Sequence, residues 1–507
     1  TVREDPEFKP ETEIFPIPLA GSESPPGDDS TTRFEKEILQ RENGHSTVTD
    51  SATITMTDSV NITVTDSATI AGTDTWSATK PGSAAVTTAG NLPEATVKAS
   101  TPVLPANRDS LLGIIFPITF PGDDTGILDP FFSKLEDLQK GILHSTRILH
   151  IGDSQIENDR MTALIRFRLQ RHFGGTGTGL VPAVPIYDGH LAYEKEERGD
   201  WLRHTFFGKR DTSITHRSYG VMGAFASVPG SGHGEWPMLH YRFNTSRRTG
   251  RFDRIRIFMH SFKSDARVAF QVNDTISDTL VHISEGFGVT EYAPAAPVKD
   301  LKISMGLPEG GRVYGISFES ERGIQVDNIA MRGSAGLTFS RMDRPQLAEM
   351  LGELSPGLIL FQFGGNVVPY LDPGYYRNAL RKELDFIREI SPGVPVILIG
   401  PADMSTKERG MYVSFPGLEH IRNALKEAAM ESGCGFWDLY QAMGGRNSMP
   451  GFVEAEPPLA TSDYVHFTPL GANLVAEMFY NSLLLEYNRF LEQRTIETPY
   501  PNEQSDP

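Results

Sequence analysis

The hydrophobic pattern of this chain changes twice between residues 110 and 493, and this change restricts the possible folds more than any other feature. At both ends of that stretch, apolar residues at helical spacing alternate with short apolar runs that are typical of buried strands. Between about 187 and 330 the segments are short, β-branched or alternating, and glycine, proline, aspartate and asparagine separate them. The sequence therefore predicts two architectures within one chain.

The first α/β stretch contains a helix, a strand, a tight turn and a second helix. Leu128–Lys140 has apolar residues at helical spacing, and Arg147–Ile151 has the pattern of a short buried strand. Gly152-Asp153-Ser154 forms the turn, and the apolar face of the helix that follows consists of Met161, Leu164, Ile165 and Leu169. Residues in such a turn lie at the carboxyl end of the strand, where ligands of open α/β sheets bind.

The second α/β stretch begins near residue 343. Its expected helices are Pro345–Leu354, Tyr376–Ile387, Leu418–Leu425 and Gly471–Phe490, and its expected strands are Leu358–Phe363, Pro395–Gly400 and Gly435–Tyr440. Strands that alternate with helices predict a parallel sheet covered by helices on both faces. We therefore predict a three-layer α/β/α domain formed by residues 110–186 and 331–493, interrupted at a loop by an inserted all-β sandwich of residues 187–330.

The two ends of the chain are expected to lack regular structure. Residues 1–103 are rich in threonine, serine, aspartate, proline and glycine and have few large apolar residues, so we predict a disordered tail. Within this tail a Thr-Asp-Ser motif recurs with a period of eight, starting at Thr49, Thr57 and Thr65. This repeat is either simple low complexity or a stalk with acceptors for O-glycosylation. Residues 494–507 are expected to form a flexible C-terminus.

Charge and cysteine content exclude several functions. The net charge is −18, about half of it in the first 110 residues, so we expect no nucleic-acid binding. The single cysteine, Cys434, permits neither an internal disulfide nor a cysteine-based zinc site. No apolar run reaches the roughly 18–20 residues that span a bilayer, so we expect no transmembrane segment. The tail, and a first residue that is not methionine, favour a mature exported protein, periplasmic or on the surface of a bacterium.

Two segments place chemically useful residues directly after a strand. Ser154 follows the first strand and precedes a helix, so its hydroxyl is exposed beside backbone N–H groups that can bind an oxyanion. A plain N-cap serine is the alternative. Gly364-Gly365-Asn366 follows the strand Leu358–Phe363. Its paired glycines let a ligand approach the backbone and its asparagine amide offers donors, with a plain turn as the alternative.

The third segment of this kind is Asp463-Tyr464-Val465-His466, which precedes the last helix. An aspartate three residues ahead of a histidine can accept the imidazole N–H, fix its tautomer and stabilise the imidazolium ion. A surface aspartate beside a capping histidine is the alternative. Together with Ser154, this pair would complete the nucleophile, base and carboxylate of a serine hydrolase.

Taken together and in this order, the segments resemble the conserved blocks of the SGNH (GDSL-like) hydrolase family. Gly152-Asp153-Ser154 is similar to block I, Gly365-Asn366 to block III and Asp463-x-x-His466 to block V. Block II of the family contributes a glycine, for which Gly333 is the first candidate and Gly336 a close competitor.

The resemblance covers roughly residues 110–186 and 331–493. It extends to an exported bacterial subgroup in which a carbohydrate-binding-like β-domain is inserted after block I, as in peptidoglycan O-acetylesterases. Gly179-Leu180-Val181-Pro182 and Phe436-Trp437-Asp438 also resemble that subgroup. Gln155 stands where the name-giving pattern of the family has leucine, and we interpret it as a mark of the subgroup.

The resemblance implies a serine esterase that uses an acyl-enzyme. Ser154 would be the nucleophile, His466 its base and Asp463 the residue that orients the base. The oxyanion hole would consist of the backbone N–H groups of Ser154 and Gly333 and the side chain of Asn366. No metal ion and no organic cofactor is implied.

The expected substrate is an O-acylated, first of all O-acetylated, carbohydrate, with peptidoglycan as first choice. Gln155, Gly365 and Asp403 are candidates for substrate contacts, because they lie at the same edge of the predicted sheet. Two other functions fit the sequence: an O-acyltransferase that uses the same triad, and a glycan-binding protein without catalysis. The sequence carries no signal for an oligomeric state.

Overall fold

The computed structural model describes most of the chain after residue 104. The described ranges are 105–185, 192–208, 211–228, 236–261, 266–273, 275–279, 286–368 and 372–497. The predicted disordered tail, residues 1–103, lies outside the described residues. Within those ranges, no helix combines the length and the apolar character that crossing a membrane requires.

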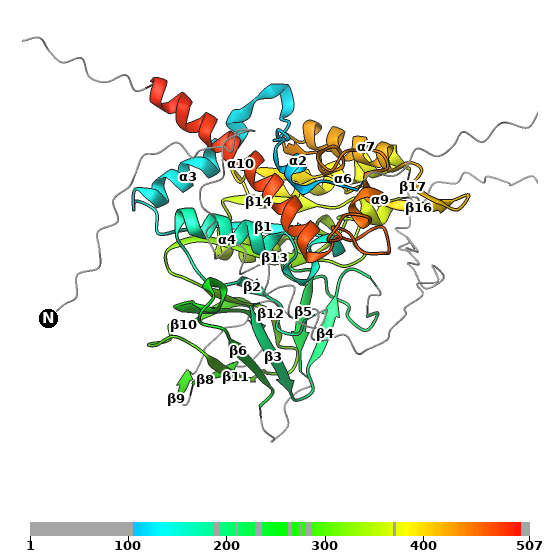
Figure 1. The fold of residues 1–507 in the computed structure, drawn as a ribbon. Coiled ribbons are helices and arrows are strands. Elements are labelled where there is room, and N and C mark those ends of the chain that lie inside the picture. The colour runs from blue at the N-terminus through cyan, green and yellow to red at the C-terminus, as the bar shows by residue number, and fades with distance from the viewer. Residues whose placement is uncertain are drawn as a thin grey trace, which may run out of the picture. The chain divides into compact units, whose positions relative to one another are not determined.

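A parallel sheet with helices on both sides forms one part of the structure (Figure 1). Its strands, in spatial order, are β13 (Gly323–Ala330), β1 (Ser145–Gly152), β14 (Leu358–Gln362), β15 (Val396–Ile399) and β18 (Gly435–Trp437). The α-helices are α2 (Arg108–Leu112), α3 (Asp129–Gln139), α4 (Thr162–Phe173), α5 (Arg344–Leu354), α6 (Pro373–Ile390), α7 (Leu418–Glu431), α8 (Leu439–Ala442), α9 (Ser448–Val453) and α10 (Pro469–Glu497). Every neighbouring pair of strands in this sheet is parallel, as predicted.

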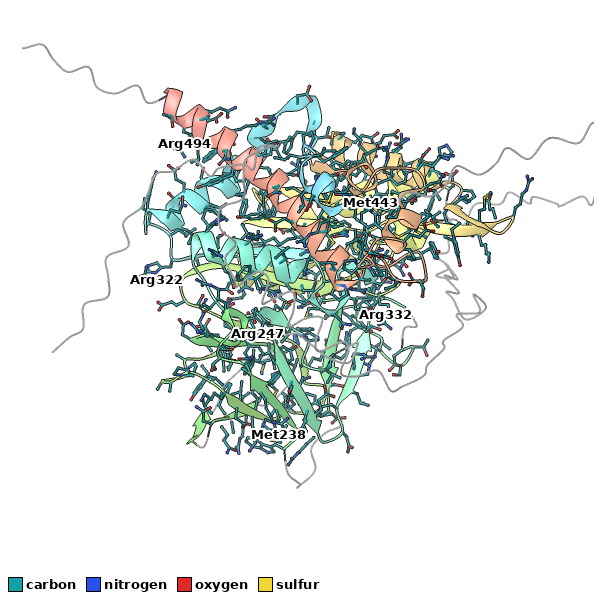
Figure 2. All side chains as sticks on the ribbon, in the orientation of Figure 1. Met238, Arg247, Arg322, Arg332, Met443 and Arg494 are labelled. Atoms are coloured by element: carbon teal, nitrogen blue, oxygen red, sulfur yellow. The ribbon has the colours of Figure 1, made fainter. Side chains whose placement is uncertain are left out.

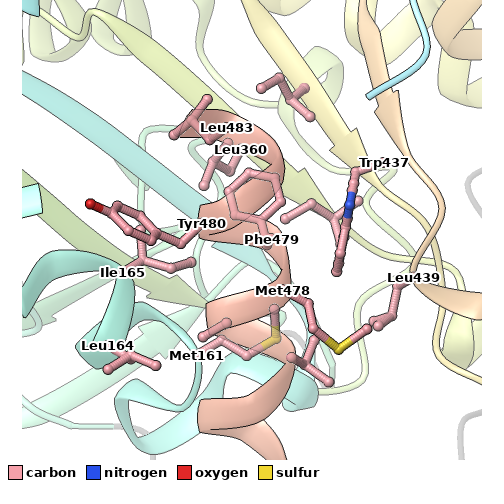
Figure 3. Packing of buried hydrophobic residues seen from close by; sticks show 14 of the residues in the cluster. Met161, Leu164, Ile165, Leu360, Trp437, Leu439, Met478, Phe479, Tyr480 and Leu483 are labelled. Atoms are coloured by element: carbon pink, nitrogen blue, oxygen red, sulfur yellow. The ribbon is translucent and has the colours of Figure 1, made fainter. Parts of the chain in front are cut away.

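The strands of the parallel sheet turn alternate side chains to two separate hydrophobic cores. In β1, Ile148 packs into the core that α3, α4 and α10 cover, and Leu149 packs into the core that α5, α6 and α7 cover. Figure 3 shows the first of these cores, where Trp437 of β18 meets Phe479 of α10 at a centroid distance of 5.3 Å. Because both faces of these strands are buried, β14, β15 and β18 appear in the sequence as mainly apolar runs.

Two antiparallel sheets form the other part of the structure. One contains β10 (Gly286–Tyr292), β7 (Arg254–Ser261), β12 (Arg312–Glu319), β5 (Ala224–Ser227) and β4 (Leu202–Thr205), with β2 (Gly179–Val181) paired to β12. The other contains β3 (Tyr193–Arg198), β6 (Met238–Phe243), β11 (Asp300–Gly306), β8 (Arg267–Val272) and β9 (Thr275–Thr279). Side chains of both sheets, such as Ile257 and Phe270, share one core, so the sheets pack face to face. The predicted fold class is confirmed.

Two strands pair in a different sheet from the one to which the predicted domain boundaries assign them. β13 falls in the segment 187–330 assigned to the sandwich, but it pairs with β1 in the parallel sheet. In Figure 2, the labelled residues Arg322 and Arg332, which flank β13 in the sequence, lie between the helices and the antiparallel sheets. Conversely, β2 falls in the segment 110–186 but pairs with β12. In β13 the polar residues Gln325, Asp327 and Asn328 interrupt the apolar ones, as in a half-exposed antiparallel strand, yet all three are buried in the structure.

A buried network of charges ties the parallel sheet to the antiparallel sheet that contains β12. Arg147 of β1 donates to both carboxylate oxygens of Asp327 in β13, at 2.8 and 2.7 Å, and also pairs with Glu319 of β12. Glu319 in turn pairs with Arg254 of β7 at 2.8 Å. Because breaking a buried ion pair leaves an uncompensated charge, this network holds the two parts in one arrangement.

The last helix is longer than predicted. α10 ends at Glu497 instead of near residue 490, so residues 494–497 are helical and only the end of the predicted flexible C-terminus, 498–507, lies outside the described residues. Arg494 lies over the ring of Phe490 and pairs with Glu136 of α3 at 2.8 Å, which stabilises this additional turn.

Candidate active site

Ser154 lies just after the carboxyl end of β1, and β1 is an interior strand of the parallel sheet. β1 ends at Gly152, where a Cβ atom would come within 2.9 Å of the Gln362 carbonyl oxygen in β14, so a larger residue would push the strands apart. Asp153 then caps the 3-10 helix Ser154–Asp159 by accepting the Gln155 backbone N–H at 3.0 Å. Ser154 is therefore the first residue of a helical turn, where backbone N–H groups have no partner within the helix.

The carboxyl group of Asp153 is buried beside this turn, with 4% of the residue exposed. Burial raises its pKa to about 6, although the hydrogen bond from the Gln155 N–H partly offsets the effect. Ordinary carboxyl groups of aspartate titrate near 3.9. Asp153 therefore changes its charge at a higher pH than a solvent-exposed aspartate.

His466 lies in the loop between α9 and α10, and Asp463 orders this loop. One carboxylate oxygen, Oδ1, accepts hydrogen bonds from the backbone N–H groups of Val465 and His466, at 2.9 and 3.0 Å, and from the hydroxyl of Thr461 at 2.6 Å. The other oxygen, Oδ2, lies 2.7 Å from Nδ1 of His466. Partial burial raises the pKa of Asp463, but these hydrogen bonds outweigh burial and the net effect lowers it. Asp463 is therefore ionised over the whole range in which proteins usually work.

The serine and the histidine, 312 positions apart in the sequence, meet at this edge of the sheet. Oγ of Ser154 lies 2.9 Å from Nε2 of His466, and Nδ1 of the same ring faces Asp463. A hydroxyl, an imidazole and a carboxylate in this order have the geometry in which a base removes the proton of an oxygen nucleophile.

Asn366 approaches the same place from the next strand. It follows β14 in the 3-10 helix Gly365–Val367, and its Nδ2 donates a hydrogen bond to the Ser334 carbonyl oxygen at 3.2 Å. A carboxamide carries two N–H groups, so this contact orients the side chain and leaves the second N–H for a ligand.

The two glycine candidates for block II lie in one loop after β13. Gly333 has a φ of 74°, and a Cβ atom there would meet nothing within 4 Å. Gly336 has a φ of 76°, and a Cβ atom there would lie 2.8 Å from the ring of Phe363. Packing alone therefore requires glycine at 336, while the backbone conformation favours it at both positions. Neither is among the described residues that line the pocket below.

A small pocket joins these groups. Its volume is about 110 Å³. It is lined by Asp153, Ser154, Gln155, Gln362, Phe363, Gly365, Asn366, Pro401, Ala402, Met404, Val465 and His466. The nucleophile, base and amide candidates thus share one cavity with Gly365, whereas Asp463 lies behind His466.

Two of the predicted substrate contacts have other partners. Gln155 lines the pocket, but its Nε2 donates to the Val465 carbonyl oxygen at 2.6 Å and so links the serine turn to the histidine loop. Asp403 has no exposed surface; Oδ1 accepts the Ser414 hydroxyl at 2.6 Å and Oδ2 accepts the Met449 N–H at 2.9 Å. Both carboxylate oxygens of Asp403 thus bind groups of the protein itself, and its contact with substrate stays a prediction.

Arg160, which was not predicted from the sequence, links the two catalytic segments. Its guanidinium donates to the Ser154 carbonyl oxygen at 2.6 Å and to the Phe467 carbonyl oxygen at 3.5 Å. An arginine shortly after the serine turn was the available signal, but its partner lies more than 300 positions away and could not be read from the sequence.

A hairpin that was not predicted from the sequence lies beside the histidine loop. Its strands are β16 (Ser405–Glu408) and β17 (Met411–Ser414). The Ser405 N–H donates to the Tyr464 carbonyl oxygen at 2.9 Å, and the rings of Tyr412 and Tyr464 stack with centroids 3.5 Å apart. The hairpin thus supports the loop from its outer side.

No cluster of histidine, cysteine and carboxylate side chains suited to holding a metal ion occurs among the described residues. The only cysteine, Cys434, is buried, and burial raises the pKa of its thiol to about 12. It lies in the core that α7 covers and is not among the described residues that line the pocket.

Comparison with known proteins shows which family and which solved structures this chain is similar to. Residues 283–474 match the GDSL-like lipase/acylhydrolase family. A solved peptidoglycan O-acetylesterase is 21% identical, with a TM-score of 0.57, and the match covers 73% of this chain and 97% of that chain. A family two carbohydrate esterase from Clostridium thermocellum is 10% identical over 55% of this chain and 97% of that chain, with a TM-score of 0.23. No curated protein sequence matches this chain significantly.

Proposed function

We propose that this chain, an SGNH hydrolase with a GDSL-like lipase/acylhydrolase domain, is a serine esterase that removes short O-acyl groups from a carbohydrate. The observation that carries the proposal is the alignment of Ser154, His466 and Asp463, with the distances of 2.9 and 2.7 Å that join them. Fold alone does not determine a reaction, so the proposal depends on this site.

The reaction would proceed in two steps. His466 takes the proton from Oγ of Ser154 through Nε2 while Oγ attacks the carbonyl carbon of the ester. The tetrahedral intermediate collapses when the same imidazole gives its proton to the leaving sugar oxygen, and an acyl-serine remains. Water, deprotonated by His466, then attacks the acyl-serine, releases the carboxylic acid and restores the Ser154 hydroxyl. Asp463 stabilises the imidazolium ion in both steps.

The oxyanion of each tetrahedral intermediate needs donors that are in place beforehand. The proposed donors are the Ser154 N–H, at the start of a helical turn, and the second amide N–H of Asn366. The resemblance to block II of the family adds the N–H of Gly333, in the loop after β13, as a third proposed donor. Each such donor typically contributes roughly 2.7–4 kcal/mol to the lowering of the barrier. No step requires a metal ion or an organic cofactor.

The size of the pocket supports a short acyl group. Pockets that enclose a whole small-molecule ligand have volumes of roughly 300–1,000 Å³, whereas this one has about 110 Å³. The pocket is thus suited to an acetyl group, and the sugar that carries the ester would lie outside it. The small volume of the pocket therefore favours acetyl esters over the esters of long-chain acids.

We propose peptidoglycan as the first substrate to test. The support is the similarity of fold to a structure described as a peptidoglycan O-acetylesterase. With that substrate the enzyme would work outside the cytoplasm, in the periplasm or on the surface of a bacterium.

The test compares the wild-type protein with Ser154→Ala. We expect the wild type to hydrolyse p-nitrophenyl acetate and to release acetate from O-acetylated peptidoglycan, and Ser154→Ala to do neither. Ser246→Ala, which changes an exposed loop serine of the β-sandwich, is the matched control and should behave as wild type. Equal rates for wild type and Ser154→Ala would show that Ser154 is not the nucleophile. Turnover of the p-nitrophenyl ester without release of acetate from any glycan would refute the proposed substrate class alone.

A further inference from the structure

A second and larger cavity lies next to the proposed active site. Its volume is about 460 Å³, within the range of pockets that hold small-molecule ligands. It is bounded by the end of β17, the first turn of α7 and the segment Tyr440–Asn447. The reaction described above does not use any of these residues.

The two cavities share a wall at the base of the hairpin β16–β17. Met404 lines the small catalytic pocket and Phe415 lines the large cavity. The Phe415 N–H donates to the Met404 carbonyl oxygen at 2.9 Å, so the backbone segments that line the two cavities are hydrogen-bonded neighbours.

The lining of the large cavity combines the ring of Phe415 with polar groups, among them the hydroxyl of Tyr440, a residue that is only 1% exposed. Arg446 binds Glu419 through two hydrogen bonds of 3.0 Å, and the Tyr440 hydroxyl donates to the same carboxylate at 2.8 Å. These contacts lower the pKa of Glu419 to about 2, so its carboxylate remains an acceptor with a fixed direction. Phe415 and Asn447 complete the lining. A pyranose ring, which has apolar C–H faces and hydroxyl groups at its edge, is complementary to such a surface.

Charge restricts the ligand further. The cavity is lined by two carboxylates, Glu408 and Glu419, and by one guanidinium, that of Arg446, which is already paired. A phosphate or carboxylate ligand would meet a surplus of negative charge, and like charges repel. The lining therefore favours an uncharged ligand over an anionic one.

We propose that this cavity is a carbohydrate subsite, which holds an uncharged sugar residue of the same glycan strand while the ester of a nearby sugar occupies the catalytic pocket. The inference rests on the proposed function, because it extends the substrate from a single acetylated sugar to a strand of several. A sugar bound in this cavity would add binding energy that a single acetylated sugar lacks, so the enzyme would prefer polymeric substrates.

The first test fills the cavity. His420 is an exposed residue of the first turn of α7 that lines it, so His420→Trp adds bulk without removing a residue of the core. We expect the ratio of kcat/KM on O-acetylated glycan strands to kcat/KM on p-nitrophenyl acetate to fall about tenfold, equivalent to about 1.4 kcal/mol, mainly through KM. Asn423→Trp, an exposed position of the same helix outside the cavity, is the matched control and should leave this ratio unchanged. An unchanged ratio for His420→Trp would overturn the proposal.

The second test does not depend on catalysis. A tetramer of N-acetylglucosamine is titrated into Ser154→Ala and into the double variant Ser154→Ala/His420→Trp, with calorimetry as the readout. We expect binding to the first and a loss of at least about tenfold in affinity for the second. Equal binding to both, or binding to neither, would overturn the subsite. If the wild-type protein has no esterase activity, the proposed function fails, whereas this titration still decides whether the cavity binds sugar.

Discussion

The substitution Asp463→Asn gives the sharpest test of the proposed triad, because the structure fixes which way the new amide must face. Oδ1 of Asp463 accepts three hydrogen bonds, from Thr461, Val465 and His466. If the amide nitrogen took that position, three donors would lose their acceptor, at a cost of about 1 kcal/mol or more each. The nitrogen must therefore take the position of Oδ2 and point at Nδ1 of His466.

This orientation reverses the tautomer of the histidine. An amide nitrogen is a donor, so Nδ1 of His466 becomes the acceptor and the ring proton moves to Nε2, which faces Ser154. An imidazole protonated at Nε2 cannot take the proton of the serine hydroxyl. For a serine hydrolase with this change the loss in kcat is about ten-thousand-fold, or about 5.4 kcal/mol at roughly 1.36 kcal/mol for each factor of ten.

The assay is hydrolysis of p-nitrophenyl acetate by wild type and Asp463→Asn, together with thermal unfolding of both. We expect kcat to collapse and the unfolding temperature to stay close to that of wild type, because the three hydrogen bonds to Oδ1 remain. Asp372→Asn is the matched control: Asp372 caps α6, and asparagine is as good a cap, so activity and stability should both be preserved. If Asp463→Asn keeps activity within tenfold of wild type, the carboxylate does not set the tautomer and the triad is misassigned.

Three further changes test other parts of the structure. Asn366→Ala should lower kcat on p-nitrophenyl acetate by about 100- to 1,000-fold with little change in KM, whereas an unchanged kcat would exclude it from the oxyanion hole. In the folded protein the pKa of Asp153 is about 6, above the ordinary value, so the native state holds the proton to a higher pH than the unfolded state does. The free energy of unfolding of the wild type should therefore fall by up to about 3 kcal/mol as the pH rises from about 4 to 6. Urea titrations of wild type and Asp153→Asn test this, since the variant should lack that pH dependence. Arg147→Ala should lower the free energy of unfolding by about 3–5 kcal/mol, because it leaves Asp327 and Glu319 as buried charges without this partner. A urea midpoint equal to that of wild type would contradict this prediction.

The sequence predicted best those features that are encoded locally. The buried face of α4 contains Leu164, Ile165 and Leu169, as their spacing indicated, and Met161 is buried directly before the helix. A strand, a tight turn and a helix follow one another at Ser154 because glycine and an aspartate cap occur in consecutive positions there. Such features depend on residues a few positions apart, and single-chain patterns report them.

Features that depend on distant partners were not predictable in the same way. The partner of β13 could not be identified, since polar residues interrupt its apolar ones although all eight residues of the strand are buried. Asp403 was interpreted as a substrate contact because it follows a strand, yet its role depends on Ser414 and on Met449, which is 46 positions away. In each case the contact that determines the role of the residue joins segments far apart in the sequence. The spacing of apolar residues does not indicate such contacts.

The positions of the pocket residues show which of the two parts of the chain forms the catalytic pocket. All residues that line the catalytic pocket lie in 153–155, 362–366, 401–404 and 465–466, so the described part of the antiparallel sheets contributes none of them. The sandwich is nevertheless not a removable attachment. β13 forms an edge of the parallel sheet beside β1, and Asp327 of β13 shares Arg147 with Glu319 of β12. Deleting residues 187–330 would therefore remove the neighbour of the strand that carries Ser154, and leave Arg147 buried without either carboxylate. Any contribution of the sandwich to substrate choice must act on a strand of glycan that extends beyond the catalytic pocket, because its described residues do not reach the site of ester cleavage.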